Sequence, residues 1–309
     1  MSSNFFSVSK LPNSEWDFFW NHIHLPDEIK YDALRLILTE HKMSSLVRDF
    51  ALSKIIFVHG PPGCGKTTMV RGVCNEAGKR MIGEQCYFAE LNFHNLYSQN
   101  YGESEKLIAK AFKYVEELST FGNIVFILFD EVESILTERE ITLSNANPVD
   151  AFRGVNEVLK SIDELSLKSP KTFYFATSNL LSAVDKAFVD RTDRIFFVDF
   201  PNYSARFQIL RDVCETTNKA FSASINMNCS KFRKLVYVTQ GLSGRQLRKL
   251  VLETVTSSDV LYQEPFKIQI DDLISVALRL KARNQASVPN DCQFDNCCTV
   301  SRRNPHERR

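Results

Sequence analysis

The sequence predicts an α/β fold in which a parallel sheet of five strands is followed by a smaller helical domain. Short apolar runs of strand length recur along the first two thirds of the chain, and segments with helical spacing separate them. Alternating strands and helices are typical of a parallel sheet with helices on its faces. The expected strands span residues 54–59, 86–91, 124–129, 172–177 and 195–200.

The first expected strand leads into a loop with the spacing of a phosphate-binding loop: a glycine, four residues and then Gly-Lys-Thr. Glycines let backbone N–H groups come close to a phosphate. Lys66 can reach the outer phosphates, and the Thr67 hydroxyl can bind Mg²⁺. We therefore expect a nucleotide and Mg²⁺ at this loop. Its residues are Gly60, Pro61, Pro62, Gly63, Cys64, Gly65, Lys66, Thr67 and Thr68.

The chain of 309 residues divides by its pattern into four segments. Its composition, 44% hydrophobic and 24% charged, is typical of a globular protein with ample core. Beyond residue 201 the spacing is helical, and the last residues have no apolar period. We expect a flexible N-terminus at 1–10, the α/β domain at 11–201, a helical lid domain at 202–283 and a disordered tail at 284–309.

Charge and hydropathy bound the partners of the chain. The net charge of +1 favours neither nucleic acid nor an acidic membrane as a direct partner. No window of about 20 residues is apolar enough to span a membrane, and the first residues lack a secretory signal, so we expect an unanchored intracellular protein. The eight cysteines show no metal-binding spacing and are expected to be reduced. Cys64 either has a lowered pKa near a helix N-terminus or simply fills space.

Polar side chains follow the third and fourth expected strands. The third ends in Asp130 and Glu131, at the edge where sheets of this kind bind ligands. We expect Asp130 to hold Mg²⁺ and Glu131 to polarise an attacking water. We expect Glu133 to be a surface residue of the following turn. The fourth strand ends at Asn179, whose neutral amide can hydrogen-bond both the γ-phosphate and the attacking water.

Three arginines are candidates for binding phosphate. A guanidinium is always charged and binds phosphate oxygens, so Arg191 and Arg194 at the edge of a protomer can reach a neighbour's nucleotide. Alternatively, they form surface salt bridges with Asp190 or Asp193. Arg245 lies in the first turn of an expected helix, where a cation opposes the helix dipole. We therefore expect it to contact the γ-phosphate, with a tolerated surface arginine as the alternative.

Together these motifs resemble those of AAA+ ATPases. Four segments also resemble the pachytene checkpoint protein 2 family, also called thyroid receptor-interacting protein 13. They are F-D-E-V-E-S at 129–134, T-S-N at 177–179, A-F-V-D-R at 187–191 and G-L-S-G-R-x-L-R-K at 241–249. The resemblance covers residues 11–281. It implies ATP and Mg²⁺ as cofactors and a ring-shaped homo-hexamer.

The resemblance also implies a function. Members of this family use ATP hydrolysis to unfold part of HORMA-domain proteins on meiotic chromosome axes and in spindle checkpoint silencing. By this resemblance we expect a HORMA-domain client and a place in the nucleus or cytoplasm, with association with chromosomes.

Two features depart from the family pattern. Members carry an N-terminal recognition domain before the ATPase, and here the phosphate loop begins at residue 60, so we expect that domain to be lacking. The pore segment that grips substrate usually has two aromatic residues and aligns with residues 100–105. We expect Tyr101 and Gly102 at the pore, where only Tyr101 keeps a ring, and a second pore loop at 138–150. One ring buries less area than two, so pulling should be weaker.

Two other functions stay open. The missing recognition domain and the reduced pore fit a non-catalytic or regulatory ring subunit. Basic residues in the helical domain fit a nucleic-acid-linked AAA+ factor such as a clamp loader, although we recognise no DNA-binding element. Every catalytic position is filled, however, which favours an active ATPase that remodels proteins.

Overall fold

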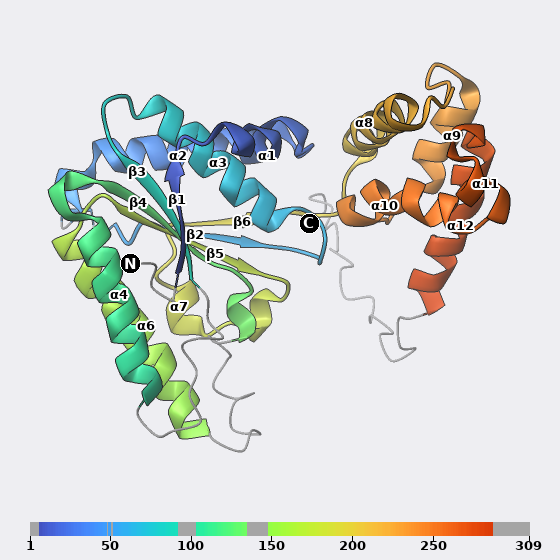
Figure 1. The fold of residues 1–309 in the computed structure, drawn as a ribbon. Helices are drawn as coiled ribbons and strands as arrows, with labels where there is room; N and C mark the ends of the chain where they lie inside the picture. The colour runs from blue at the N-terminus through green and yellow to red at the C-terminus, as the bar shows by residue number, and fades with distance from the viewer. Residues whose placement is uncertain (1–5, 48, 51, 92–102, 135–147, 287–309) are drawn as a thin grey trace, which may run out of the picture.

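The computed structural model describes residues 6–47, 49–50, 52–91, 103–134 and 148–286. They form a sheet with helices on both faces and a separate group of helices, so the predicted α/β fold is confirmed (Figure 1). The sheet has the order β1-β3-β4-β5-β2-β6, in which β1 runs antiparallel to β3 and the other pairs are parallel. The strands are β1 Phe6–Leu11, β2 Ile55–His59, β3 Cys86–Leu91, β4 Ile124–Phe129, β5 Thr172–Ser178 and β6 Arg194–Phe197.

Helices cover the two faces of the sheet (Figure 1). On one face lie α1 Asp17–His22, α2 Asp27–Lys42 and α3 Lys66–Arg80, and on the other lie α4 Glu103–Leu118, α6 Pro148–Lys168 and α7 Lys186–Val189. Short 3₁₀ turns connect the elements. They are η1 Ser14–Trp16, η2 Ser44–Leu46, η4 Thr120–Gly122, η5 Val132–Ser134, η6 Leu181–Ala183 and η7 Pro265–Lys267.

The apolar runs of the sequence are strands buried on both faces. Successive residues of β2 alternate between the two cores: Ile55 and Phe57 pack with α4 and α6, whereas Ile56 and Val58 pack with α2 and α3. All six residues of β4 are buried. This two-sided burial is why the central strands are continuously apolar, and it holds their polar ends at one edge of the sheet.

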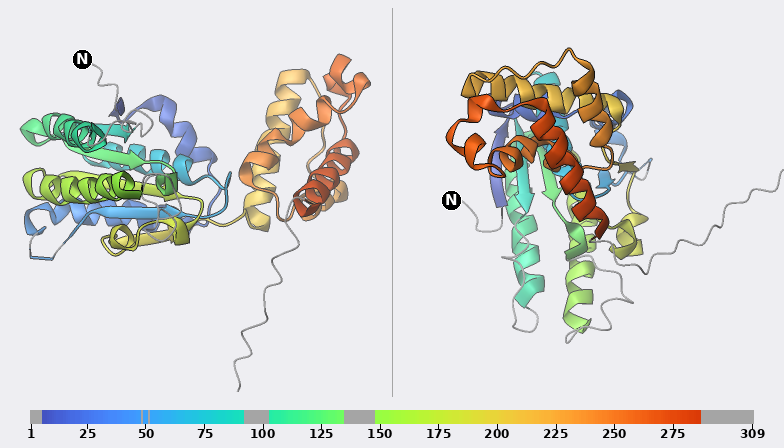
Figure 2. Two further views of the ribbon diagram at one scale, coloured as in Figure 1. Left: turned by 90° about the horizontal axis from the view of Figure 1, so that it is seen from below. Right: turned by 90° about the vertical axis from the view of Figure 1, so that its right-hand side faces the viewer.

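The helices after residue 201 form a third hydrophobic cluster of their own. They are α8 Tyr203–Phe221, α9 Ser230–Val238, α10 Gly244–Val255, α11 Asp259–Gln263 and α12 Ile270–Ala286. Leu235, Leu247 and Leu273 come from α9, α10 and α12 and are almost fully buried in it. Figures 1 and 2 show this group beside the sheet, joined to it by the chain after β6. We call it the helical group.

The N-terminal segment corrects two predictions. We expected residues 1–10 to be flexible and the sheet to have five parallel strands, but residues 6–11 form a sixth, antiparallel strand on β3. Phe6 and Leu11 are buried, on opposite faces of the sheet, and the Phe6 ring stacks on Tyr114. Pairing with β1 covers the edge of β3 that would otherwise present unpaired backbone groups.

Two further expectations concern the C-terminal tail and membrane-spanning helices. Residues 284–286 complete α12 and so do not belong to a tail, whereas residues 287–309 lie outside the described residues. Among the helices that are described, none combines the length and the apolar character that a membrane span needs.

Candidate nucleotide-binding site

The phosphate loop connects β2 to α3 through glycines in unusual backbone conformations. Gly60, Gly63 and Gly65 have φ of 148°, 76° and 102°, where residues with a side chain are rarely found. A Cβ on Gly60 would lie 2.0 Å from the carbonyl oxygen of Val198. The loop can therefore turn tightly beneath the start of α3 only because these positions carry no side chain.

Lys66 begins α3 and lies almost fully buried at the centre of the site. Its ammonium donates to the carbonyl oxygens of Gly60 and Pro61 at 2.8 and 3.0 Å and to Oδ1 of Asn179 at 2.8 Å. Burial lowers the pKa of Lys66, and nearby acidic groups, Glu133 and Asp130 among them, oppose this shift. The contact with Asn179 joins two residues that are 113 positions apart in the sequence.

Asp130 follows β4 and meets the phosphate loop. Its Oδ1 accepts hydrogen bonds from the Thr67 hydroxyl at 2.8 Å and from the Thr177 hydroxyl. A hydroxyl and a carboxylate side by side offer the hard oxygen donors that Mg²⁺ prefers. Among the described residues there is no cluster of three or more His, Cys, Asp or Glu side chains of the kind that holds a metal by itself. This donor set fits Mg²⁺, which uses few protein ligands and takes others from phosphates and water.

Thr177 is a site residue that sequence reasoning missed. It is the sixth residue of β5 and is fully buried. Its hydroxyl donates to Asp130 and also accepts from the backbone N–H of Glu131 at 3.0 Å. One hydroxyl thus fixes both acidic residues at the end of β4. In the sequence Thr177 reads as part of an apolar run, which gives no signal of this contact.

Glu131 occupies a left-handed backbone conformation with φ of 53°. Such a conformation is uncommon for a residue with a long side chain and is often found where function requires it. Glu131 lines the same cavity as Lys66, Thr67 and Asp130. Glu131 therefore lies next to the phosphate loop, and its role toward an attacking water stays a prediction.

The structure differs from our prediction for Glu133. We expected a surface residue of the turn after β4, but Oε1 of Glu133 accepts from both the backbone N–H and the side-chain amide of Asn179, each at 2.9 Å. These two bonds orient the Asn179 amide so that its oxygen meets Lys66. The sequence offered two signals for Glu133, its position just after Asp130 and Glu131 and its place in the F-D-E-V-E-S segment at 129–134.

The helical group closes the site from the other side. The backbone N–H of Arg245 donates to the carbonyl oxygen of Gly63 at 3.0 Å. Ser243 and Gln246 form a capping box at the start of α10, which fixes this end of the helix. A Cβ on Gly63 would lie only 3.0 Å from the Ser243 hydroxyl, so the loop and α10 touch closely. Arg245 lies in this first turn, as we expected, and lines the cavity, while its contact with the γ-phosphate stays a prediction.

A cavity of about 360 Å³ lies between these parts. Its lining comes from the phosphate loop, the ends of β4 and β5, the first turns of α10, and the end of α1 with the segment that leads into α2. Sequence reasoning missed the last of these, residues 22–25, because a short turn far from any motif carries no pattern. Other residues that line the cavity are ones that we predicted from the sequence as site residues: Pro62, Gly63, Cys64, Gly65, Lys66, Thr67, Thr68, Asp130, Glu131, Asn179 and Arg245.

Arg191 and Arg194 do not line this cavity. The Arg191 guanidinium donates to the carbonyl oxygen of Ala187 at 2.8 Å and to Asp163 at 3.4 Å, rather than to Asp190 or Asp193. Arg194 is exposed at the start of β6. Their role toward a neighbouring copy stays a prediction.

Two other expectations concern the pKa of Cys64 and the residues of the pore. Burial raises the pKa of the Cys64 thiol to about 11, and Lys66 opposes this only in part, so the lowered pKa that we considered is wrong. Cys64 is buried and fills space within the loop. Tyr101, Gly102 and most of the expected second pore loop lie outside the described residues.

Comparison with known proteins identifies relatives of this chain. The family model for the ATPase family associated with various cellular activities (AAA) matches residues 56–200. A pachytene checkpoint protein 2 homologue of Oryza sativa subsp. indica is 31% identical over 283 residues, which is 79% of this chain and 59% of that protein. The homologue of Arabidopsis thaliana is 35% identical over 213 residues, 66% of this chain and 45% of that protein. The chain thus spans about half the length of these relatives.

Solved structures show the same fold. C. elegans PCH-2 superposes with a TM-score of 0.74 at 24% identity, over 93% of this chain and 78% of that chain. A chain of the E. coli MS115-1 HORMA:CdnC:Trip13 complex superposes with a TM-score of 0.72 at 17% identity, over 89% of this chain and 95% of that chain. The family model and the sequence relatives show that the chain contains a AAA ATPase domain and is homologous to the pachytene checkpoint protein 2 family, as the motifs of its sequence suggested.

Proposed function

We propose that this chain hydrolyses ATP with Mg²⁺ and uses the energy to remodel a protein client. The observation that carries the proposal is the meeting of the phosphate loop with two strand ends. Lys66 lies 2.8 Å from Asn179 at the end of β5, and Thr67 lies 2.8 Å from Asp130 at the end of β4. This is the arrangement that P-loop ATPases use to hold a metal-bound triphosphate.

In this proposal each residue has one task. The loop N–H groups and Lys66 bind the phosphates, and Thr67 and Asp130 hold Mg²⁺, which would neutralise charge on the phosphate oxygens. Glu131 polarises the attacking water. Asn179, oriented by Glu133, hydrogen-bonds the γ-phosphate and that water.

Arginines complete the site. We propose that Arg245 contacts the γ-phosphate from the helical group, which acts as a lid domain at 202–283 over an α/β domain at 11–201. Arg191 and Arg194 lie outside the cavity of their own chain, which fits a role at the nucleotide of a neighbouring copy in a homo-hexamer. An arginine supplied in this way can raise the hydrolysis rate by about 10³ to 10⁵.

The proposed client is a HORMA-domain protein. The relatives are named pachytene checkpoint protein 2 homologues, and a structure similar to this chain comes from a complex that contains a HORMA protein. We propose that Tyr101 and Gly102 grip the client and that the chain acts in meiotic chromosome and checkpoint control, in association with chromosomes.

The variant Glu131→Gln tests the proposal. It should bind ATP as the wild type does, lose hydrolysis, and retain a purified HORMA-domain protein in a pull-down with Mg²⁺ and ATP. The exposed residue Glu117 on α4 gives a matched control, Glu117→Gln, which should hydrolyse ATP normally. Undiminished hydrolysis by Glu131→Gln would refute the assignment, and a HORMA protein that never binds would refute the client.

A further inference from the structure

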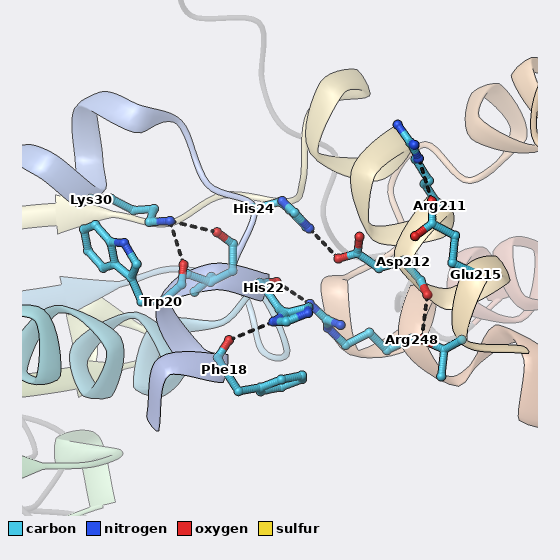
Figure 3. Close-up of polar contacts among 11 residues, drawn as sticks. Phe18, Trp20, His22, His24, Lys30, Arg211, Asp212, Glu215 and Arg248 are labelled. Carbon is cyan, nitrogen blue, oxygen red and sulfur yellow. Dashed lines mark hydrogen bonds and ion pairs between the residues drawn. The ribbon is translucent and has the colours of Figure 1, made fainter. Parts of the chain in front are cut away.

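The turn between α1 and α2 contacts both the α/β part of the molecule and the helical group. Residues 20–25, which we call the strap, end α1 and lead into α2 (Figure 3). The strap residues His22, Ile23, His24 and Leu25 line the nucleotide cavity together with the phosphate loop and α10.

The strap is fixed to the α/β part by Lys30 and by the phosphate loop. The Lys30 ammonium, on α2, donates to the carbonyl oxygens of Trp20 and Ile23 at 2.8 and 3.4 Å and lies 4.4 Å from the centre of the Trp20 ring (Figure 3). Ile23 packs directly on the loop, since a Cβ on Gly65 would lie 3.1 Å from its Cδ1. The strap therefore has a defined position relative to the phosphate loop.

Two side-chain contacts join the strap to the helical group (Figure 3). Nε2 of His24 lies 2.7 Å from Oδ2 of Asp212 on α8, and both side chains are about three quarters buried, with 21% and 28% exposed. The Arg248 guanidinium, on α10, donates to the backbone carbonyl of His22. The two contacts join residues that are 188 and 226 positions apart in the sequence.

These contacts bear on the phosphate loop through α10. Arg248 lies one helical turn beyond Arg245, and the N–H of Arg245 donates to the Gly63 carbonyl. A contact that fixes Arg248 therefore also fixes the N-terminal end of α10, which touches the phosphate loop. The contact between His24 and Asp212 fixes α8 against the strap, and α8 in turn packs against α10.

We propose that His24, Asp212 and Arg248 are positioning residues that clamp the helical group onto the phosphate loop and so keep Arg245 at the phosphates. This inference rests on the proposed nucleotide site and adds the residues that set its closure. Loss of the clamp should leave the chemistry of Asp130 and Glu131 intact while nucleotide is held more weakly. The expected signature is a raised KM for ATP with little change in kcat.

A pair of substitutions at one position isolates the clamp. His24→Leu removes the polar contact with Asp212, whereas His24→Gln retains an N–H that can donate to it. Arg211 gives a matched control on the same helix, because it pairs with Glu215 one turn further along α8 at 2.8 Å and makes no contact with the strap (Figure 3). Arg248→Met removes the second contact, because its side chain has no N–H to donate, and tests that contact independently should His24→Leu fail to fold.

The first measurement is hydrogen–deuterium exchange without nucleotide. The peptide that contains Arg245 should exchange faster in His24→Leu and Arg248→Met than in the wild type, because its N–H bond to Gly63 is made less often. His24→Gln and Arg211→Ala should exchange as the wild type does. Unchanged exchange of this peptide in both His24→Leu and Arg248→Met would overturn the proposal.

The second measurement is the affinity for fluorescent mant-ATP. His24→Leu should weaken binding about tenfold, the size expected from one lost charge-assisted hydrogen bond, whereas His24→Gln and Arg211→Ala should stay within about twofold of the wild type. Equal affinity in His24→Leu and wild type would also overturn the clamp. Failure of the wild type to bind mant-ATP would instead refute the proposed function, and the exchange experiment would still decide whether the clamp exists.

Discussion

The buried hydroxyl of Thr177 is the most discriminating point at which to perturb the site. It donates to Asp130, expected to hold Mg²⁺, and accepts from the N–H of Glu131, the expected base. Thr177→Val replaces the hydroxyl by a methyl group of nearly the same shape. Packing is thus kept while two polar partners lose their bond.

The structure gives the size of the effect. Thr177 is fully buried, so Thr177→Val leaves the N–H of Glu131 without this partner and removes one hydrogen bond to a carboxylate. Loss of such a partner costs about 1–3 kcal/mol. We expect a fall of about 2 kcal/mol in the free energy of unfolding. If the same loss misplaces Glu131 in the transition state, kcat should fall about 10- to 100-fold.

The assay compares Thr177→Val with Thr177→Ser, which keeps the hydroxyl and loses only a methyl group. Steady-state ATP hydrolysis gives kcat, urea unfolding gives stability, and mant-ATP titration gives affinity. Thr177→Ser should hydrolyse ATP near the wild-type rate, and Thr177→Val should bind ATP while it hydrolyses it slowly. A kcat for Thr177→Val equal to that of Thr177→Ser would refute the reasoning.

Three further predictions follow from particular contacts. Gly60→Ala should abolish nucleotide binding in a mant-ATP titration, because its Cβ would lie 2.0 Å from the Val198 oxygen; normal affinity would contradict this. Glu131→Asn should raise the free energy of unfolding by about 0.5–1 kcal/mol while it stops hydrolysis, since asparagine tolerates the left-handed φ of 53°; a less stable variant would argue against backbone strain there. Burial raises the pKa of Glu40 from 4.5 to about 8, with Asp193 adding to the shift. The folded chain then keeps a proton that the unfolded chain releases, so this contribution to stability is complete below pH 4.5 and is lost as the pH rises to about 8. Between pH 5 and 8 the free energy of unfolding should therefore fall by about 3 kcal/mol more in the wild type than in Glu40→Gln, and equal slopes in urea titrations would rule this out.

Much of the site could be predicted because local chemistry and topology agree there. The loop from Gly60 to Thr67 has a required residue at each position, and buried apolar runs locate the strands. Lys66 and Asn179 are far apart in the sequence, but each follows a parallel strand, and the ends of such strands meet at one edge of the sheet.

The features that were missed depend on tertiary partners. The strand at residues 6–11 mixes serine and lysine with apolar residues, and only its pairing with β3 and the burial of Phe6 and Leu11 make it a strand. Glu133 reads as one more acid in a polar turn until the fold brings Asn179 to it. The clamp between His24 and Asp212 joins two segments that carry no motif. Spacing along the chain contains no information on such contacts.

The affinity of the purified chain for ATP with Mg²⁺ tests the central claim most directly, with wild type and Lys66→Ala compared by calorimetric titration. The claim is that the phosphate loop and the ends of β4 and β5 hold a metal-bound triphosphate around Lys66. The wild type should bind ATP, and Lys66→Ala, shown to be folded by its thermal unfolding, should bind it at least about 100-fold more weakly, because it lacks the only cation that the loop offers. Equal affinity in the two proteins would contradict the account.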